Sequence, residues 1–265
     1  MNKISTDKAI ATLSKDGIYS AGVLDGLLYG IEEGEGIECY SDETCLLIAN
    51  TSAEYVFVEI EPTGNPLDAQ RVLDFLAEKY NKVNIIINTR LLPPEKLEKV
   101  KTVFSKKYPF IGEINDFGYT RNRMEPFLPL DCVRLLTMDD KAAFCSMNAE
   151  PTKNRPPLPV LFTIFVQNGN GNILAYFEDN VIKGYLSFEQ LRTADSSRAF
   201  DVDYIYVLPA YRGKGIGKKL AQSYLTEICN QHGKAFWSNA KNEASEKVAI
   251  STGFEIVRKA YRFQN

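Results

Sequence analysis

The sequence predicts a mixed α/β (α+β) protein: a mixed central sheet flanked by helices, preceded by a second, smaller α/β domain. Apolar runs of strand length alternate with longer amphipathic segments of helix length, which is typical of a sheet covered by helices. A similar order recurs in both halves, and two proline-rich stretches interrupt the middle. The 265 residues, 45% apolar and 25% charged, suffice for two modest cores.

The first half contains a strand–helix–strand–helix order. Tyr55–Ile60 predicts a strand, and Asn65 can cap a helix that has Pro66 at its first position, where proline is tolerated. Val83–Ile87 is a second strand, and a helix from about Pro94 to Lys107 carries one apolar face.

The second half is more regular. Its strands and helices are expected at Cys132–Leu136, Met138–Met147, Ile173–Glu178, Val181–Phe188, Phe200–Val207, Gly213–Asn230, Ala235–Asn239, Glu243–Ser251 and Glu255–Phe263. The pair Asp179-Asn180 predicts a hairpin turn, and Gly233 a left-handed helix end. Pro151–Pro159 is interpreted as a long loop, because proline continues neither a helix nor a central strand.

The Pro126–Pro129 stretch sets the predicted domain boundary. We expect an N-terminal α/β domain at 1–125, without catalytic function, and a C-terminal domain at 126–265. The similar order of elements suggests that the two are structurally related.

Composition excludes several classes of function. A net charge of −3 argues against a general nucleic-acid binder. None of the five cysteines forms a C-x-x-C pair and His232 is the sole histidine, so no zinc site and no other metal is expected. There is no secretory signal and no apolar run that could span a bilayer, which predicts a soluble, cytoplasmic protein with free thiols.

One segment carries a chemical prediction. The strand Phe200–Val207 leads through Leu208-Pro209-Ala210-Tyr211 into a glycine-rich turn that opens a helix. Main-chain N–H groups at a helix N-terminus favour an anion, and glycines let phosphate oxygens approach the backbone. Four cationic side chains surround the turn: Arg212, Lys214, Lys218 and Lys219. The predicted ligand is a pyrophosphate.

The identity of the pyrophosphate follows from spacing. A P-loop would need a glycine at Arg212 and a hydroxyl at Lys219, and a dinucleotide fingerprint would need a glycine at Lys218. The turn does match [R/Q]-x-x-G-x-[G/A], with Val207-x-Pro209 just upstream, and Asn242-x-x-Ser245 and Gly253-Phe254 follow further on. In these features the chain resembles the GNAT superfamily of N-acetyltransferases, over residues 132–265.

The resemblance implies a GNAT-type sheet and an acetyl-CoA co-substrate. In that fold two central strands splay, here 200–207 and 235–239, and the backbone of Tyr206 and Val207 would bind the pantetheine arm between them. The remaining expected cofactor contacts are Arg212, Gly213, Lys214, Gly215, Ile216, Gly217, Lys218, Asn242 and Ser245. Asn242 and Ser245 are equally interpretable as helix-capping residues.

Catalysis needs a group that takes a proton from the acceptor amine. Asp201 and Asp203 alternate onto one side of the strand, and Glu189 near the hairpin end is a further candidate base; each could instead only order the sheet or bind the amine. Many GNAT enzymes have a tyrosine acid where this chain has Ala249. The general acid is therefore unassigned.

The resulting expectation is transfer of an acetyl group to a primary amine of a small molecule or peptide by direct attack. Two alternatives stay open: a non-catalytic acyl-CoA-binding sensor or scaffold, and transfer of a longer acyl chain. The matching place in the first half, Glu61–Pro66, lacks the arginine and carries two prolines, so that half is not expected to hold CoA. It would shape the acceptor cleft or dimerise, and the protein is expected to be a monomer or homodimer without nucleic-acid or membrane partners.

Overall fold

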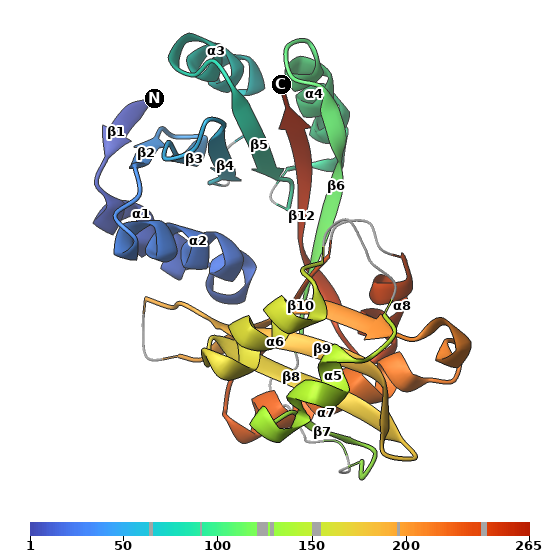
Figure 1. Cartoon of the computed structure of the whole chain (residues 1–265). Helices are drawn as coiled ribbons and strands as arrows, with labels where there is room; N and C mark the ends of the chain where they lie inside the picture. Colours follow the sequence, from blue (N-terminus) through green and yellow to red (C-terminus); the bar gives the residue numbers. More distant parts are fainter. Residues whose placement is uncertain are drawn as a thin grey trace. The chain divides into compact units, whose positions relative to one another are not determined.

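The computed structural model describes residues 1–63, 66–90, 92–120, 127, 130–149, 155–194, 197–239 and 243–265 (Figure 1). The chain forms two compact units. Unit 1 comprises Met1–Asp116, Arg192–Ser196 and Ile256–Asn265, and unit 2 comprises Phe117–Leu191 and Ser197–Glu255. The predicted boundary at 125 and 126 lies outside the described residues.

Unit 1 begins at the N-terminus and ends within a long strand. Its elements are β1 (Asn2–Ile4), α1 (Thr6–Ser14), the 3-10 turn η1 (Gly17–Ser20), α2 (Ala21–Glu32), β2 (Ile37–Ser41), β3 (Cys45–Asn50), β4 (Val56–Pro62), α3 (Ala69–Lys79), β5 (Val83–Asn88), α4 (Pro94–Ser105) and β6 (Phe110–Gly118). The last strand of the chain, β12 (Glu255–Gln264), pairs antiparallel with β5. Although the sequence assigns this strand to the C-terminal domain, its residues from Ile256 onward therefore pack with unit 1.

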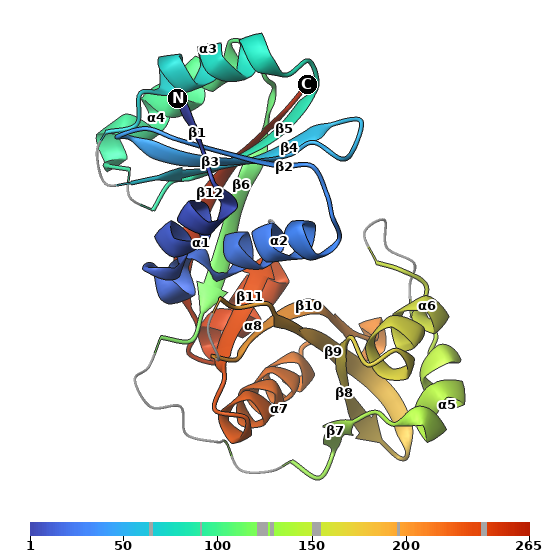
Figure 2. The same ribbon diagram turned by 90° about the vertical axis from the view of Figure 1, so that its left-hand side faces the viewer.

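The sheet of unit 1 is covered on both faces. β1 to β4 pair antiparallel in chain order, and β4 pairs parallel with β5 across the α3 crossover. Figure 2 shows α3 and α4 on one side of these strands and α1 and α2 on the other. Each side has its own apolar core, because alternate residues such as Leu47 and Leu46 of β3 point to opposite faces.

The strands near 55–60 and 83–87 and the helix from Pro94 are confirmed. The expected capping by Asn65 lies outside the described residues, and α3 starts later, where Asp68 accepts a hydrogen bond from the N–H of Arg71. The elements before residue 55, and β6, were not predicted from the sequence.

Unit 2 repeats the same order. It contains β7 (Val133–Leu135), the 3-10 turn η2 (Met138–Asp140), α5 (Lys141–Cys145), α6 (Leu158–Phe162), the π-helical turn η3 (Thr163–Gln167), β8 (Gly171–Glu178), β9 (Val181–Leu191), β10 (Ala199–Val207), the 3-10 turn η4 (Pro209–Tyr211), α7 (Ile216–Asn230), β11 (Lys234–Asn239) and α8 (Glu243–Ser251). β7 to β10 pair antiparallel, and β10 pairs parallel with β11. Figure 2 shows α7 on one side of these strands and α5 and α6 on the other.

Most elements of unit 2 match the prediction, including the Asp179-Asn180 turn, where both residues have positive φ. The loop interpretation of Pro151–Pro159 is wrong from Leu158 onward, because Leu158, Leu161, Phe162 and Phe165 lie at helical spacing and are all buried. Pro159 fits there because a first helical turn needs no donor from it.

Two smaller corrections concern helix ends. The predicted helix from Met138 is a 3-10 turn followed by the short α5. The left-handed residue after α7 is His232, with φ +53°, and not Gly233. Gly233 is required for another reason: a Cβ there would lie 2.7 Å from the ring of Phe200.

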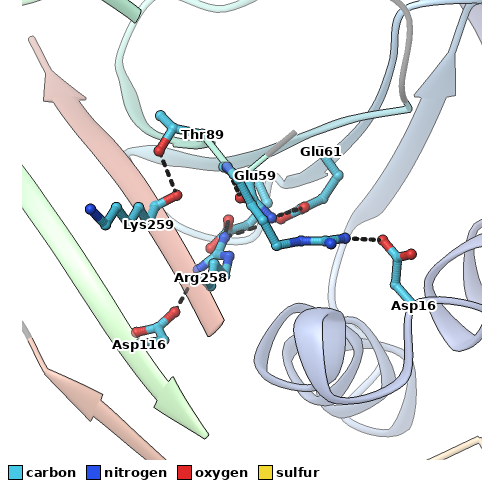
Figure 3. A network of polar contacts seen from close by, with 9 residues as sticks. Asp16, Glu59, Glu61, Thr89, Asp116, Arg258 and Lys259 are labelled. Atoms are coloured by element: carbon cyan, nitrogen blue, oxygen red, sulfur yellow. Dashed lines mark hydrogen bonds and ion pairs between the residues drawn. The ribbon is translucent and has the colours of Figure 1, made fainter. Parts of the chain in front are cut away.

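A buried ionic network joins four strands of unit 1 (Figure 3). Arg258 of β12 donates to Glu59 at 2.7 Å and Glu61 at 3.1 Å on β4, and to Asp116 of β6 at 3.1 Å. Asn88 of β5 donates to the second oxygen of Glu61 at 2.6 Å. Burial raises the pKa of Glu59 to about 7, although the guanidinium lowers it. Burial likewise raises the pKa values of Glu61 and Asp116. Three carboxyl groups thus share one cation.

Candidate active site

The glycine-rich turn lies between β10 and α7, as the sequence predicts. Gly215 is the N-cap of α7, with φ +77°, and offers no side chain to the first N–H groups of the helix. Gly213 has φ +78°. Two left-handed residues this close together turn successive N–H groups in a common direction, which makes a concave anion-binding backbone. A Cβ added at either glycine would meet nothing within 4 Å. The space in front of the turn is therefore open.

The other residues of the turn differ in their surroundings. Lys214 and Lys218 are exposed, whereas Ile216 is buried in the core below α7. A Cβ at Gly217 would lie 3.1 Å from Val248 of α8. Gly217 thus allows α7 and α8 to pack closely, a structural reason for this glycine beside its expected contact with a cofactor.

The side chain of Arg212 points back toward the end of β10. Its Nε donates to the carbonyl oxygen of Val207 at 3.1 Å, and its guanidinium lies 5.7 Å from the ring centre of Tyr206. Tyr206 is buried, while Val207 is half-buried. These contacts orient the guanidinium at the end of β10.

β10 and β11 pair over only part of their length. Among the described residues their parallel pairing joins Ala199–Asp201 to Lys234–Phe236, although β10 continues to Val207 and β11 to Asn239. The expected separation of these two strands is therefore present. Beyond Asp201, the described part of β10 has no register partner on β11, and this is the side on which an extended ligand could pair with the strand.

Asp201 stands where the pairing ends. Its carboxylate accepts hydrogen bonds from the N–H of Ser238 at 2.9 Å and from the Ser238 hydroxyl at 2.6 Å. It also lies opposite Glu189 of β9 in the register of the antiparallel pair. Two of the three expected carboxylates are thus cross-strand neighbours.

Asp203 lies in a β-bulge. The pairing of β10 with β9 passes from Val202, opposite Phe188, directly to Tyr204, opposite Ser187. The strand is therefore irregular at this point, and the expectation that Asp201 and Asp203 lie on one side stays a prediction. Burial raises the pKa of Tyr204, as do the charges of Asp203 and Glu189, so all three groups lie near one another.

Several groups around these carboxylates were not predicted from the sequence. Tyr185 and Ser187 of β9 share a face with Glu189 and are fully buried, and the Ser187 hydroxyl has no hydrogen-bond partner in the described part of the chain. Burial raises the pKa of Tyr185 to about 12, against the nearby guanidinium of Arg155, which lowers it. The alternating Tyr-x-Ser-x-Glu order of this strand was the available signal.

The remaining expected residues follow β11. Asn242 lies outside the described residues. Ser245 of α8 is buried, and its hydroxyl accepts a hydrogen bond from the indole N–H of Trp237 at 2.9 Å. This contact gives Ser245 a structural role, whether or not it also touches a cofactor. Ala249 is fully buried in the apolar core and offers no acid.

The matching place in unit 1 is built differently. There the parallel strands β4 and β5 stay paired from Val56 to Ile60, so they do not separate where β10 and β11 do. Pro62 at the end of β4 and Pro66 after it cannot donate main-chain hydrogen bonds.

The turn fits the diphosphate of CoA on three grounds: left-handed glycines, open space where a Cβ would stand, and cations at its rim. No group of three or more acidic, cysteine or histidine side chains in the described ranges could hold a metal ion. No helix within those ranges is long and apolar enough to cross a membrane.

Comparisons with known proteins agree with this geometry. Residues 137–254 match the model of the acetyltransferase (GNAT) family. Over 86 residues, 32% of this chain and 50% of each relative, the chain is 34% identical to an L-methionine sulfoximine/L-methionine sulfone acetyltransferase of Salmonella typhimurium and 33% identical to the L-amino acid N-acyltransferase MnaT of Escherichia coli. It thus spans about half the length of these curated relatives.

A solved structure extends the likeness in fold. An acetyltransferase from the GNAT family of Colwellia psychrerythraea superimposes with a TM-score of 0.58 at 14% identity, covering 99% of this chain and 98% of that one. The GNAT fold thus accounts for nearly the whole length, N-terminal half included. Residues 137–254 thus match the acetyltransferase (GNAT) family, and the fold of nearly the whole chain is that of a GNAT structure.

Proposed function

We propose that this protein transfers an acetyl group from acetyl-CoA to a primary amine of a small molecule or peptide, by direct attack of the amine. One observation carries the proposal: a glycine turn with open space in front of it follows directly on a strand that separates from its parallel neighbour. A diphosphate suits the turn, and an extended amide-containing arm suits the free strand edge.

Acetyl-CoA supplies an acetyl group activated as a thioester. The N–H groups from Gly213 to Gly217 would hold its diphosphate, with Arg212, Lys214 and Lys218 at the rim. The side of β10 that faces β11, at Tyr206 and Val207, would bind the pantetheine amides. Asn242 and Ser245 belong to this proposal on the resemblance alone.

The carboxylates prepare the acceptor. An ammonium must lose a proton before its nitrogen can attack a carbonyl carbon. Asp201, Asp203 and Glu189 lie near the separation of β10 and β11, and one of them would take this proton, directly or through water. The negative charge of the same group would attract a cationic acceptor.

The names of the relatives narrow the acceptor panel. Both curated relatives are named for amino acids or amino-acid analogues. We infer that free α-amino groups of amino acids are the first acceptors to test, followed by polyamines and peptide N-termini. Arg155, close to Tyr185 on the carboxylate side of the sheet, would suit an acceptor carboxylate.

Two measurements on the purified protein test the proposal. Calorimetry should detect acetyl-CoA binding, and release of the CoA thiol should accelerate with at least one amine of the panel. Absence of binding would reject the assignment. Because Ala249 leaves no hydroxyl at its position, binding without turnover on any amine would favour the sensor or scaffold function instead.

A further inference from the structure

A cluster of two lysines and one tyrosine lies at the glycine turn. Lys214 belongs to the turn itself, whereas Lys183 and Tyr211 have no part in the function proposed above. The Nζ of Lys183 lies 4.7 Å from the ring centre of Tyr211, and the Nζ of Lys214 lies 4.6 Å from the same centre. Lys183 comes from the start of β9, Tyr211 from η4, and Lys214 from the turn itself. Three separate segments thus bring two ammonium groups to one ring.

The backbone fixes this arrangement. The N–H of Leu208 donates to the carbonyl oxygen of Lys183 at 2.9 Å, and the N–H of Tyr211 donates to the carbonyl oxygen of Leu208 at 2.8 Å. Gly184 lets the segments approach, because a Cβ there would lie 2.8 Å from the carbonyl oxygen of Tyr206. The start of β9 and the turn are therefore held together by main-chain contacts.

The charges of the cluster are not balanced within the described part of the chain, where neither ammonium group has a carboxylate partner. Two like charges near one ring repel each other, and the ring quadrupole attracts each exposed cation only weakly. A bound dianion would attract both ammonium groups and so offset the repulsion between them. The cluster is thus suited to a compact anion of charge −2.

CoA carries two separate anionic groups, a diphosphate and a 3′-phosphomonoester on its ribose. The turn would bind the diphosphate through main-chain N–H groups, whose positions are fixed by the backbone. The lysine pair consists of side-chain point charges, which suit a phosphomonoester that accepts from any direction. We propose that Lys183 and Lys214, positioned by Tyr211, bind the 3′-phosphate of CoA and select it over 3′-dephospho-CoA. This inference rests on the proposed cofactor site.

Calorimetry with the two ligands tests the assignment through a double comparison. Wild-type protein should bind CoA about tenfold more tightly than 3′-dephospho-CoA. Lys183→Met should lower the affinity for CoA about tenfold and leave the affinity for 3′-dephospho-CoA unchanged, and Lys214→Met should lower the affinity for CoA more than the affinity for 3′-dephospho-CoA. If the lysines touch the diphosphate instead, both ligands lose affinity equally, and the proposal is wrong.

Two controls sharpen the result. Lys234→Met removes an exposed lysine at the opposite end of the β10–β11 pair, next to Ala199, and should change neither affinity. Tyr211→Phe keeps the ring and should behave as wild type, whereas Tyr211→Leu should weaken CoA binding severalfold. Equal binding of the two ligands by wild type overturns the inference alone. Failure to bind either ligand rejects the cofactor site as well.

Discussion

The Asp201 carboxylate accepts two hydrogen bonds from Ser238, one from its main-chain N–H at 2.9 Å and one from its hydroxyl at 2.6 Å. Asp201 is the last residue of β10 that pairs with β11, and Ser238 lies just beyond the pairing on β11. The contact therefore lies where β10 and β11 begin to separate. It gives Asp201 a structural role that competes with its expected role as a base.

Two variants separate these roles. If Asp201 takes the proton, Asp201→Asn lowers turnover about a hundredfold with little change in acetyl-CoA affinity, the usual scale for losing a general base. Ser238→Ala keeps the carboxylate and should then retain most activity. If Ser238→Ala instead lowers turnover as much as Asp201→Asn does, the Asp201 carboxylate serves only to hold β10 and β11 together. Asp139→Asn, on an exposed turn of the same unit, is the control.

Gly215→Glu should abolish acetyl-CoA binding in calorimetry, because it places a carboxylate against the diphosphate. The backbone at Gly215 has φ +77°, so any side chain also strains the turn. Gly169→Glu is a matched control: Gly169 has φ +71° and equally open space around it. It should lose a similar amount of stability and bind normally. Unchanged affinity in Gly215→Glu would remove the cofactor site.

Ser245→Ala should destabilise unit 2 by about 1–3 kcal/mol in urea unfolding, since the buried N–H of Trp237 loses its acceptor. A loss of acetyl-CoA affinity beyond that of the destabilised protein would add a cofactor contact. Unchanged stability would contradict the structural role of the hydroxyl.

Arg258→Met should destabilise unit 1 by about 3–5 kcal/mol, because three buried carboxyl groups lose the cation that they share. Arg192→Met provides the comparison. Arg192 also pairs with two carboxylates, Asp25 and Glu32, but its side chain is 36% exposed, so its loss should cost less than about 1 kcal/mol. Urea unfolding of both variants measures the difference, and similar losses would show that burial of the network is unimportant.

Stability should fall as pH rises from about 4.5 to 7. Burial raises the pKa of Glu59 to about 7, so the folded chain keeps a proton there that the unfolded chain releases. The slope is at most about 1.4 kcal/mol per pH unit and per proton. Glu38 affects stability in a different pH range. Burial raises its pKa, but hydrogen bonds from Tyr80 and Lys3 lower it to about 2, so the stability that its ionised form contributes is lost only as the pH falls below about 4.5 toward 2.

Unfolding of wild type and Glu59→Gln at several pH values checks this dependence. The glutamine cannot titrate, so its slope between pH 4.5 and 7 should be shallower. Equal slopes would show that Glu59 is ionised in the folded protein throughout this range.

The sequence by itself determined most elements of unit 2, the glycine turn and the resemblance to the GNAT family, because local spacing encodes each of them: apolar residues four apart in α7, Gly213 and Gly215 before a helix, Asp179-Asn180 between two strands. Only the tertiary structure decided which distant residues meet. The bulge at Asp203, the Ser238 contact of Asp201, the pairing of β12 with β5 and the meeting of Lys183 with Lys214 on Tyr211 depend on register between segments far apart in the chain. Register is set by how whole faces pack, and no local pattern records it.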